Sequence, residues 1–306
     1  MKKLFLSLVA TTLCAMGMFA QSSLVATLQH GSNIQAFYGD EALSAAHEAA
    51  VDGDIITLSS GNFKGCDISK AITLRGEGMS KTCITSYIKF TIPNGSAHTL
   101  FLEGIRFYSY TFYGTDGTEK VVVSKCFYEQ NSVEIHLCNA TIIQSIFSGI
   151  KSYSSNVTCT NSVIAWLEND ETGRFDIQNC WFTWWTTNSS SFHHSTIKNS
   201  IIYPGWIGST IPLHETNISS HCLVNKNINS GFADSWYVES WDGLFLDNYH
   251  LTEEAAATYL GTDGTQVGIY GGMYPYDETP DYPLVKTLDV IGSHKNGKLN
   301  VKINVK

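Results

Sequence analysis

The sequence has few basic residues: 19 Lys and Arg stand against 28 Asp and Glu, and the formal net charge is −9. Nucleic acids and anionic membrane surfaces attract positive charge, so this composition argues against both partners. Charged residues of either sign make up only 15% of the chain, whereas apolar residues make up 43%. A chain with this much apolar material can form a core, which argues against disorder.

Recognisable catalytic and metal-binding motifs are also missing. The chain has no nucleophile elbow, phosphate-binding loop or zinc-ligand spacing. The ten histidines are scattered apart from His193-His194, and neighbours on a strand point to opposite faces, so the two cannot easily ligate one ion. We therefore expect no metal and no cofactor.

The first twenty residues have the pattern of an export signal. Two lysines precede an apolar run over residues 4–19, and Ala20 followed by Gln21 is a plausible cleavage point. The run is too short for a convincing membrane span, and no later segment is apolar enough to be one. Leu13 stands before Cys14, where a lipid-modification site needs a small residue, which argues against a lipoprotein anchor. We expect an exported protein at the cell surface, in the periplasm or outside the cell.

A repeat fills the middle of the chain. Seven segments align without internal gaps on an anchor position, with an apolar residue three positions before and two positions after it. The anchors are Ile105, Cys126, Ser145, Ser162, Cys180, Ser200 and His221, spaced by 17 to 21 residues. The earlier column is Leu102, Val123, Ile142, Cys159, Ile177, Ile197 and Ile218, and the later column is Phe107, Tyr128, Phe147, Ile164, Phe182, Ile202 and Leu223.

A bend must lie immediately before each anchor. The anchor and the residue two positions later share one face of a strand, but the residue three positions earlier has the opposite parity. Asn161, Asn179 and Asn199 occupy the position before the anchor in three successive repeats, and Ser220 follows. Asparagine tolerates bent and left-handed backbone, and stacked asparagines can also bond to each other from coil to coil.

A strand–turn–strand unit repeated near every twenty residues predicts an all-β fold, a single-stranded parallel β-helix in which stacked coils bury each other's apolar side. An antiparallel sandwich is the alternative, but it does not require one residue class at the same offset seven times.

The repeat also changes how the cysteines are interpreted. Seven remain after residue 20, an odd number that cannot pair completely, although export favours disulfides. Cys126 and Cys180 fall on anchors and Cys159 falls in the earlier column, so these three read as small core residues. Cys66 and Cys83 lie outside the clear repeat, and whether they form a disulfide stays open.

Both ends of the predicted β-helix carry further signals. Residues 40–50 favour a helix with Asp40 as its N-cap, and this helix would cap the first coil. Residues 273–285 contain three prolines and read as a linker or edge segment. The alternation around Asn296-Gly297 predicts a β-hairpin over residues 286–306. The expected organisation is a signal peptide over 1–20, a lead segment over 21–39, the β-helix over 40–272, and a linker with a small C-terminal β-appendage over 273–306.

The order of helix, Gly53-Asp54, apolar strand, residues 60–63 and residues 71–76 resembles the opening of pectin-lyase-like right-handed β-helix proteins. Residues 248–272 resemble the closing segment of exported β-helix proteins common in gut-type Bacteroidetes. The resemblance implies a right-handed β-helix but no particular activity, because this fold carries lyases, hydrolases, isomerases and adhesins alike.

Enzymes of that superfamily use groups that are absent or unremarkable here. The coils hold no Asp-Asp pair, no His-Gly and no Arg-x-Lys. Glu168, Asp170 and Glu171 form the one dense acidic cluster, which could hold a hard cation but reads more simply as a solvated turn. Arg174 could clamp a substrate or pair with these acids. Hydrolysis would need two carboxylates, such as Glu168 or Asp170 with Asp176, but the spacing does not favour any one pair.

Aromatic residues give the most suggestive surface pattern. Trp166 and Trp184 stand four residues after successive anchors, Trp185 adjoins the second, and Trp206 follows on the next coil. Stacked coils would bring these indoles together on one side, where they could bind sugar rings or pack under a loop. We predict a non-catalytic binder of polysaccharide or another extended glycan, with these four tryptophans as the binding residues. The alternatives are a polysaccharide lyase or glycoside hydrolase of the pectin-lyase-like superfamily, and a structural or adhesive surface solenoid.

Overall fold

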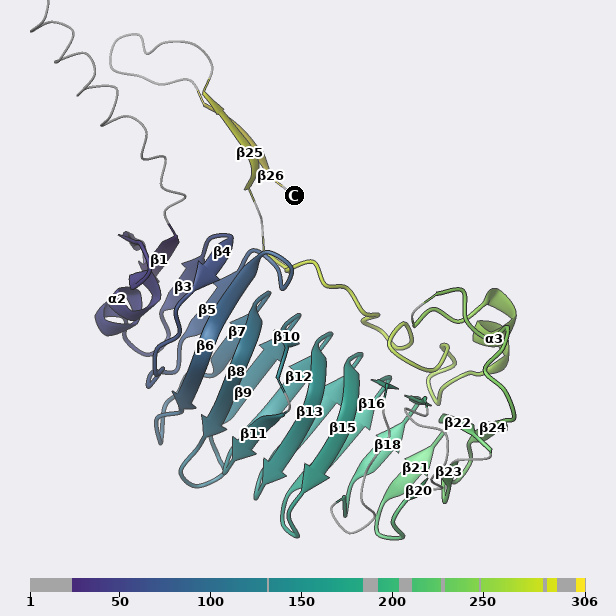
Figure 1. Cartoon of the computed structure of the whole chain (residues 1–306). Coiled ribbons are helices and arrows are strands. Elements are labelled where there is room, and N and C mark those ends of the chain that lie inside the picture. Colours follow the sequence, from purple (N-terminus) through teal and green to yellow (C-terminus); the bar gives the residue numbers. More distant parts are fainter. Residues whose placement is uncertain are drawn as a thin grey trace, which may run out of the picture.

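The computed structural model describes residues 24–130, 132–183, 192–203, 211–226, 229–247 and 249–282, together with two strands between 285 and 305. The chain forms a parallel β-solenoid of about eight turns (Figure 1). Neighbouring coils pair in parallel, which excludes the antiparallel sandwich. The right-handed sense of the coil stays a prediction.

Two eleven-stranded sheets form the long sides of the solenoid. The order in the first sheet is β2 (Asn33–Tyr38), β1 (Val25–His30), β3 (Ile55–Leu58), β5 (Thr73–Gly76), β7 (Leu100–Glu103), β9 (Lys120–Ser124), β12 (Asn139–Ile143), β14 (Asn156–Thr160), β16 (Arg174–Gln178), β18 (Thr196–Lys198) and β21 (Ile218–Ser220).

The second sheet has the main order β4 (Gly61–Phe63), β6 (Thr82–Thr91), β8 (Arg106–Tyr113), β10 (Phe127–Tyr128), β13 (Ile146–Tyr153), β15 (Val163–Asn169), β17 (Trp181–Phe182), β19 (Ile201–Ile202), β22 (Leu223–Asn225) and β24 (Trp236–Val238). Its remaining strand, β11 (Val133–His136), pairs with β8 and β13 alongside β10.

The other elements are short. Strands β20 (Ile211–Pro212) and β23 (Asn229–Ser230) form a small parallel pair. Strands β25 (Val285–Val290) and β26 (Val301–Val305) form the predicted antiparallel C-terminal hairpin. The helices are α2 (Ala42–Ala49) and α3 (Glu253–Thr258), and within the described part of the chain no helix has the length and apolar character needed to cross a membrane.

Strand register confirms the predicted columns over six coils. Val123, Ile142, Cys159, Ile177 and Ile197 are aligned by successive strand pairs, and all five side chains are buried. The later column is aligned in the same way from Phe107 to Ile202.

The last coil is shifted by one residue from its predicted alignment. Leu223 pairs with Ile201 and Ser219 pairs with Ile197, so the anchor of this coil is Cys222 and not His221. Ile218, predicted to be in the core, is 66% exposed. The prediction failed because the shifted register also placed apolar residues, Ile218 and Leu223, in both columns.

The bend before each anchor is a single residue in the left-handed backbone region. Asn161, Asn179 and Asn199 have φ values of 47°, 53° and 50°. The same position on the other coils holds Gly104 (66°), Lys125 (53°), Gln144 (49°) and His221 (52°). We call these seven residues the corner column.

From Cys126 to Cys222, the anchors form a buried row of serine and cysteine next to the corner column. The Ser145 hydroxyl accepts a hydrogen bond from the Cys126 backbone N–H (3.1 Å) and donates to the Ile143 carbonyl (2.7 Å). Cys126, Cys159 and Cys180 are core residues, as predicted. Cys66 and Cys83 are both free thiols, which answers the question that their positions left open.

The first coil is covered by more than the predicted helix. Helix α2 buries Leu43 and Ala46, but it begins at Ala42 and its N-cap is Glu41, which makes no side-chain capping bond, so the prediction of Asp40 was wrong. Strands β1 and β2 of the lead segment form an antiparallel hairpin, and β1 also pairs antiparallel with β3. This pairing covers the edge of the first parallel strand.

The C-terminal part of the chain turns back along the solenoid. Around α3 it covers the outer side of the second sheet, where Trp181, Ile201 and Leu223 pack with Leu251 and Ile269. Residues 259–282, which we call the C-terminal strap, then run from the last coils towards the first coils (Figure 1).

The left-handed backbone of Leu137, immediately after strand β11, leads to a test of stability. Leu137 has a φ of 49° and is 41% exposed, so it has left-handed strain but contributes little burial. Leu137→Asn should raise the free energy of unfolding by about 0.5–1 kcal/mol, because asparagine tolerates this conformation better. Urea denaturation measures the change. The matched control is Ile218→Asn in extended strand β21, which should lower stability; a lower stability for both variants would contradict the strain argument.

The buried thiols make stability depend on alkaline pH. Burial raises the pKa of Cys126, Cys138, Cys180 and Cys222 from 9.0 to about 12. Above pH 9 these thiols lose protons in the unfolded chain but keep them in the folded chain, so stability is full below pH 9 and falls as pH rises towards 12. Urea midpoints measured from pH 8 to 10.5 should decline, and the decline should be shallower in a Cys126→Ser, Cys180→Ser variant. An equal slope in both proteins would exclude the thiols as its cause.

Candidate ligand-binding groove

The corner column holds the C-terminal strap in place. Gln144 donates from Nε2 to the Pro275 carbonyl (2.5 Å). Asn161 donates from Nδ2 to the carbonyls of Ile269 (2.9 Å) and Gly271 (2.7 Å). The amide of Asn161 therefore bonds to the strap, and not to a neighbouring asparagine as stacking had suggested.

The strap begins its path at Asn199. The Oδ1 atom of Asn199 accepts from the Thr262 backbone N–H (2.9 Å), and its Nδ2 donates to the Thr262 hydroxyl (3.2 Å). As the strap proceeds towards the C-terminus, it therefore contacts successively earlier coils. The strap is docked by a series of corner residues, one after another.

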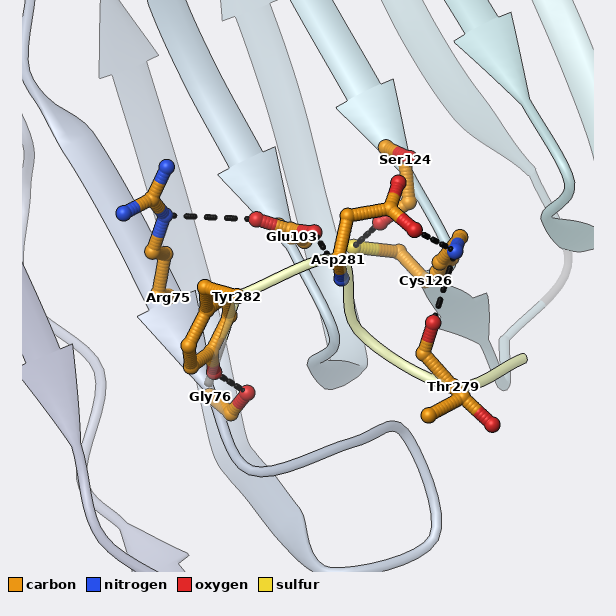
Figure 2. A network of polar contacts seen from close by, with 9 residues as sticks. Arg75, Gly76, Glu103, Ser124, Cys126, Thr279, Asp281 and Tyr282 are labelled. Atoms are coloured by element: carbon orange, nitrogen blue, oxygen red, sulfur yellow. Dashed lines mark hydrogen bonds and ion pairs between the residues drawn. The ribbon is translucent and has the colours of Figure 1, made fainter. Parts of the chain in front are cut away.

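A partly buried charge network fastens the far end of the strap (Figure 2). The Lys125 ammonium lies 2.5 Å from Oδ1 of Asp281 and donates to the Thr279 carbonyl at 2.6 Å. The Asp281 backbone N–H donates to Glu103 (2.9 Å), whose other oxygen lies 3.2 Å from Nε of Arg75. Lys125 and Glu103 are each 2% exposed, so their charges depend on these partners.

Tyr282 completes this fastening. Its hydroxyl donates to the Gly76 carbonyl, and the Arg75 guanidinium lies 5.0 Å from the centre of its ring (Figure 2). Burial raises the pKa of Tyr282 well above its ordinary value, so the phenol stays protonated and remains a donor.

A groove of about 740 Å³ lies along the strap. Its residues come from the strap, from the corner column and from the adjoining strand ends of the first sheet, over coils from Phe101 to Asn179. They are Phe101, Ser124, Lys125, Ile143, Gln144, Thr160, Asn161, Gln178, Asn179, Asp263, Gly272, Met273, Tyr274, Pro275, Asp277 and Asp281.

The groove offers many hydrogen-bond acceptors and two prominent apolar side chains. Asp263, Asp277 and Asp281 bring three carboxylates, whereas Lys125 is neutralised by Asp281. Met273 and Tyr274 are 82% and 70% exposed. The groove therefore suits a ligand that has several hydroxyl donors and an apolar face.

Trp166 lies outside this groove. It is half-buried on β15 in the second sheet, and the Lys151 ammonium lies 5.7 Å from the centre of its ring. Lys151 also pairs with Glu168 at 3.6 Å. Trp184, Trp185 and Trp206 lie outside the described residues, so their predicted grouping with Trp166 stays a prediction.

Other aromatic rings of the second sheet stack along the solenoid axis. Tyr113, His136 and Tyr153 are aligned on β8, β11 and β13, with ring centres 4.7 Å and 4.5 Å apart and planes inclined by 10° and 14°. The rings therefore cover one another's faces and leave mainly their edges for solvent. Such a stack is a poor platform for sugar rings, which bind to an open aromatic face.

The acidic cluster predicted after Trp166 contains a turn-stabilising residue. Asp170 accepts hydrogen bonds from the backbone N–H groups of Ser154 (2.9 Å) and Gly173 (2.6 Å). Burial acts to raise the pKa of Asp170, but these bonds outweigh burial and hold it below its ordinary value. In the part of the chain that the structure describes, no group of three His, Cys, Asp or Glu residues could hold a metal ion.

The remaining candidates are separate from the groove. Arg174 donates to the His194 carbonyl (3.4 Å), and His193 packs edge-on against His214 at 4.7 Å. Asp176 is exposed on β16. These contacts suggest local structural roles for Arg174, His193 and His194.

Lys125 and Gln144 are site residues that the sequence pattern did not single out. They stand immediately before the anchors Cys126 and Ser145, in the same column as the three asparagines. Reading this column as a set of polar side chains at one corner could have found them. Their strap partners, more than 100 residues away, had no comparable signal.

No protein family, curated protein or solved structure matches the chain. Its function must therefore be inferred from the groove itself.

The Lys125–Asp281 pair gives a test of strap docking. Asp281→Asn would leave the Lys125 cation buried without its counterion, so the unfolding free energy should fall by about 1–2 kcal/mol, a value between those of surface and buried pairs because Asp281 is 74% exposed. Hydrogen exchange should become faster over residues 275–282. Glu278→Gln, an exposed neighbour, is the matched control; unchanged exchange in Asp281→Asn would show that the pair does not hold the strap.

Proposed function

We propose that this chain is an exported protein that binds a polysaccharide or another extended glycan without cleaving it. The observation that carries this proposal is the groove beside the strap, which places an exposed tyrosine among carboxylate, amide and hydroxyl groups. A ligand site is commonly a concave pocket into which a few polar groups converge.

The chemistry of the groove suits a sugar chain. Sugar hydroxyls donate hydrogen bonds, and the acceptors of Asp263, Asp277, Gln178 and Thr160 border the same cavity. The apolar face of a sugar ring can pack on Tyr274, whose side chain is largely exposed. The groove runs past several coils, so a linear polymer could follow it.

Binding is favoured over hydrolysis by the roles of the carboxylates. Asp281 neutralises Lys125, and Oδ1 of Asp263 accepts from the backbone N–H (2.9 Å) and hydroxyl (2.7 Å) of Thr265. Oδ1 of Asp277 accepts from the backbone N–H of Thr279 (2.9 Å). Each carboxylate thus helps to shape the strap, whereas a hydrolase needs two carboxylates placed on a scissile bond.

The wider assignment rests on the sequence. The leader over residues 1–20 supports export to the cell surface, the periplasm or the exterior, and the opening and closing segments support a place among right-handed pectin-lyase-like proteins. The outer face around Trp166, with Trp184, Trp185 and Trp206, remains a second proposed contact for the same glycan.

Tyr274 provides the test. Binding is measured by calorimetry against a panel of neutral β-glucan, xylan and glucomannan, anionic polygalacturonate and cationic chitosan, with product analysis for cleavage. Tyr274→Ala should weaken the best interaction about tenfold, which corresponds to ~1.4 kcal/mol, because the stacking surface is removed. Tyr38→Ala is the matched control, since Tyr38 is 68% exposed on β2.

The same assay separates the alternatives. A loss of affinity in Trp166→Ala but not in Tyr274→Ala would move the site to the outer face of the second sheet. Release of oligosaccharides would identify a lyase or hydrolase. Failure of every polysaccharide to bind would contradict the proposal and favour a structural or adhesive solenoid.

A further inference from the structure

Asn179 differs from the other asparagines of the corner column. Asn161 and Asn199, on the coils before and after it, both bond to the strap through their side chains. Asn179 is 1% exposed, yet neither its Nδ2 nor its Oδ1 has a hydrogen-bond partner among the described residues. A buried amide without hydrogen-bond partners is unfavourable, and a bound ligand would relieve this cost.

Two glycines let the strap pass close above this amide. A Cβ on Gly271 would come within 2.8 Å of Nδ2 of Asn179, and a Cβ on Gly272 within 2.7 Å. Gly272 also has a φ of 78°, which other residues rarely adopt. Asn179 and Gly272 both line the groove, so this asparagine lies at the edge of the ligand cavity with its amide beneath the strap.

We infer that Asn179 recognises the ligand of this groove, and that the ligand is a neutral glycan. This inference rests on the proposed glycan-binding function. A primary amide donates and accepts side by side, so its complement is a group that also does both, such as a sugar hydroxyl or an acetamido group.

The charge of the groove selects a neutral ligand over an acidic one. Asp263, Asp277 and Asp281 line the cavity, and Lys125, the one lysine among its described lining residues, is neutralised by Asp281. A uronate or sulfated polymer would bring further negative charge next to these carboxylates, which is unfavourable. Hydroxyl groups meet no such repulsion.

A pair of glycine variants separates recognition from docking of the strap. Asn179→Gly and Asn161→Gly both place glycine at a left-handed position, with φ of 53° and 47°, so neither variant should add backbone strain. Asn161→Gly removes two bonds to the strap and should lower the urea midpoint. Asn179→Gly removes no bond of the free protein and should leave the midpoint within error, while affinity for the tightest-binding neutral polysaccharide of the panel falls at least tenfold.

The other outcomes distinguish a structural role of Asn179, glycan binding without Asn179, and the absence of glycan binding. Equal destabilisation by the two variants would show that Asn179 is structural and would overturn the inference, as would tighter binding of polygalacturonate than of neutral β-glucan. Unchanged affinity in Asn179→Gly with reduced affinity in Tyr274→Ala would overturn the role of Asn179 but leave glycan binding standing. If no polysaccharide binds the wild-type chain, the proposed function fails and this inference fails with it. Asn179→Ala repeats the measurement if the glycine variant does not fold.

Discussion

Seven successive coils each turn at the corner column through one residue in the left-handed backbone region, and the strap and the groove depend on that corner. For an ordinary L-residue this conformation costs roughly 1–2 kcal/mol. Asn161, Asn179 and Asn199 tolerate it, whereas Lys125 and Gln144 are less suited to it. The corner lets side chains on either side of it point into the same core, which strictly alternating strands would not allow.

Repetition of the corner produces a surface as well as a core. Because successive coils stack in register, residues with the same backbone conformation form a row along the solenoid. Lys125, Gln144, Asn161 and Asn199 each extend a polar group to the C-terminal strap. The row therefore accounts for the path of the strap, and the strap in turn forms one wall of the groove.

Two faces of the solenoid carry aromatic residues with different capacities for ligands. In the row of Tyr113, His136 and Tyr153, ring stacks on ring and the faces are used within the protein. Tyr274 projects from the strap and is mostly exposed. An aromatic side chain in a stacked row of the coils therefore stabilises its neighbours, whereas one on the strap stays open to a ligand.

Much of the fold could be predicted from the sequence because the repeat acts locally. Residues two apart on a strand share a face, so the columns through Val123 and Phe107 were visible as apolar positions. The same logic assigned Cys126 and Cys180 to the core. It failed at His221, because an alignment shifted by one residue also placed apolar residues in both columns.

The candidate site was less visible because its parts are distant in the chain. Lys125 and Asp281 are separated by 156 positions, and Gln144 and Pro275 by 131. No periodicity joins such pairs, since each contact arises only when the strap folds back over the corners. The sequence by itself determined the stacked coils, their core and the bends, because these follow from short-range alternation. Only the tertiary structure decided where the strap lies, which charges are neutralised and which asparagine is left without a partner.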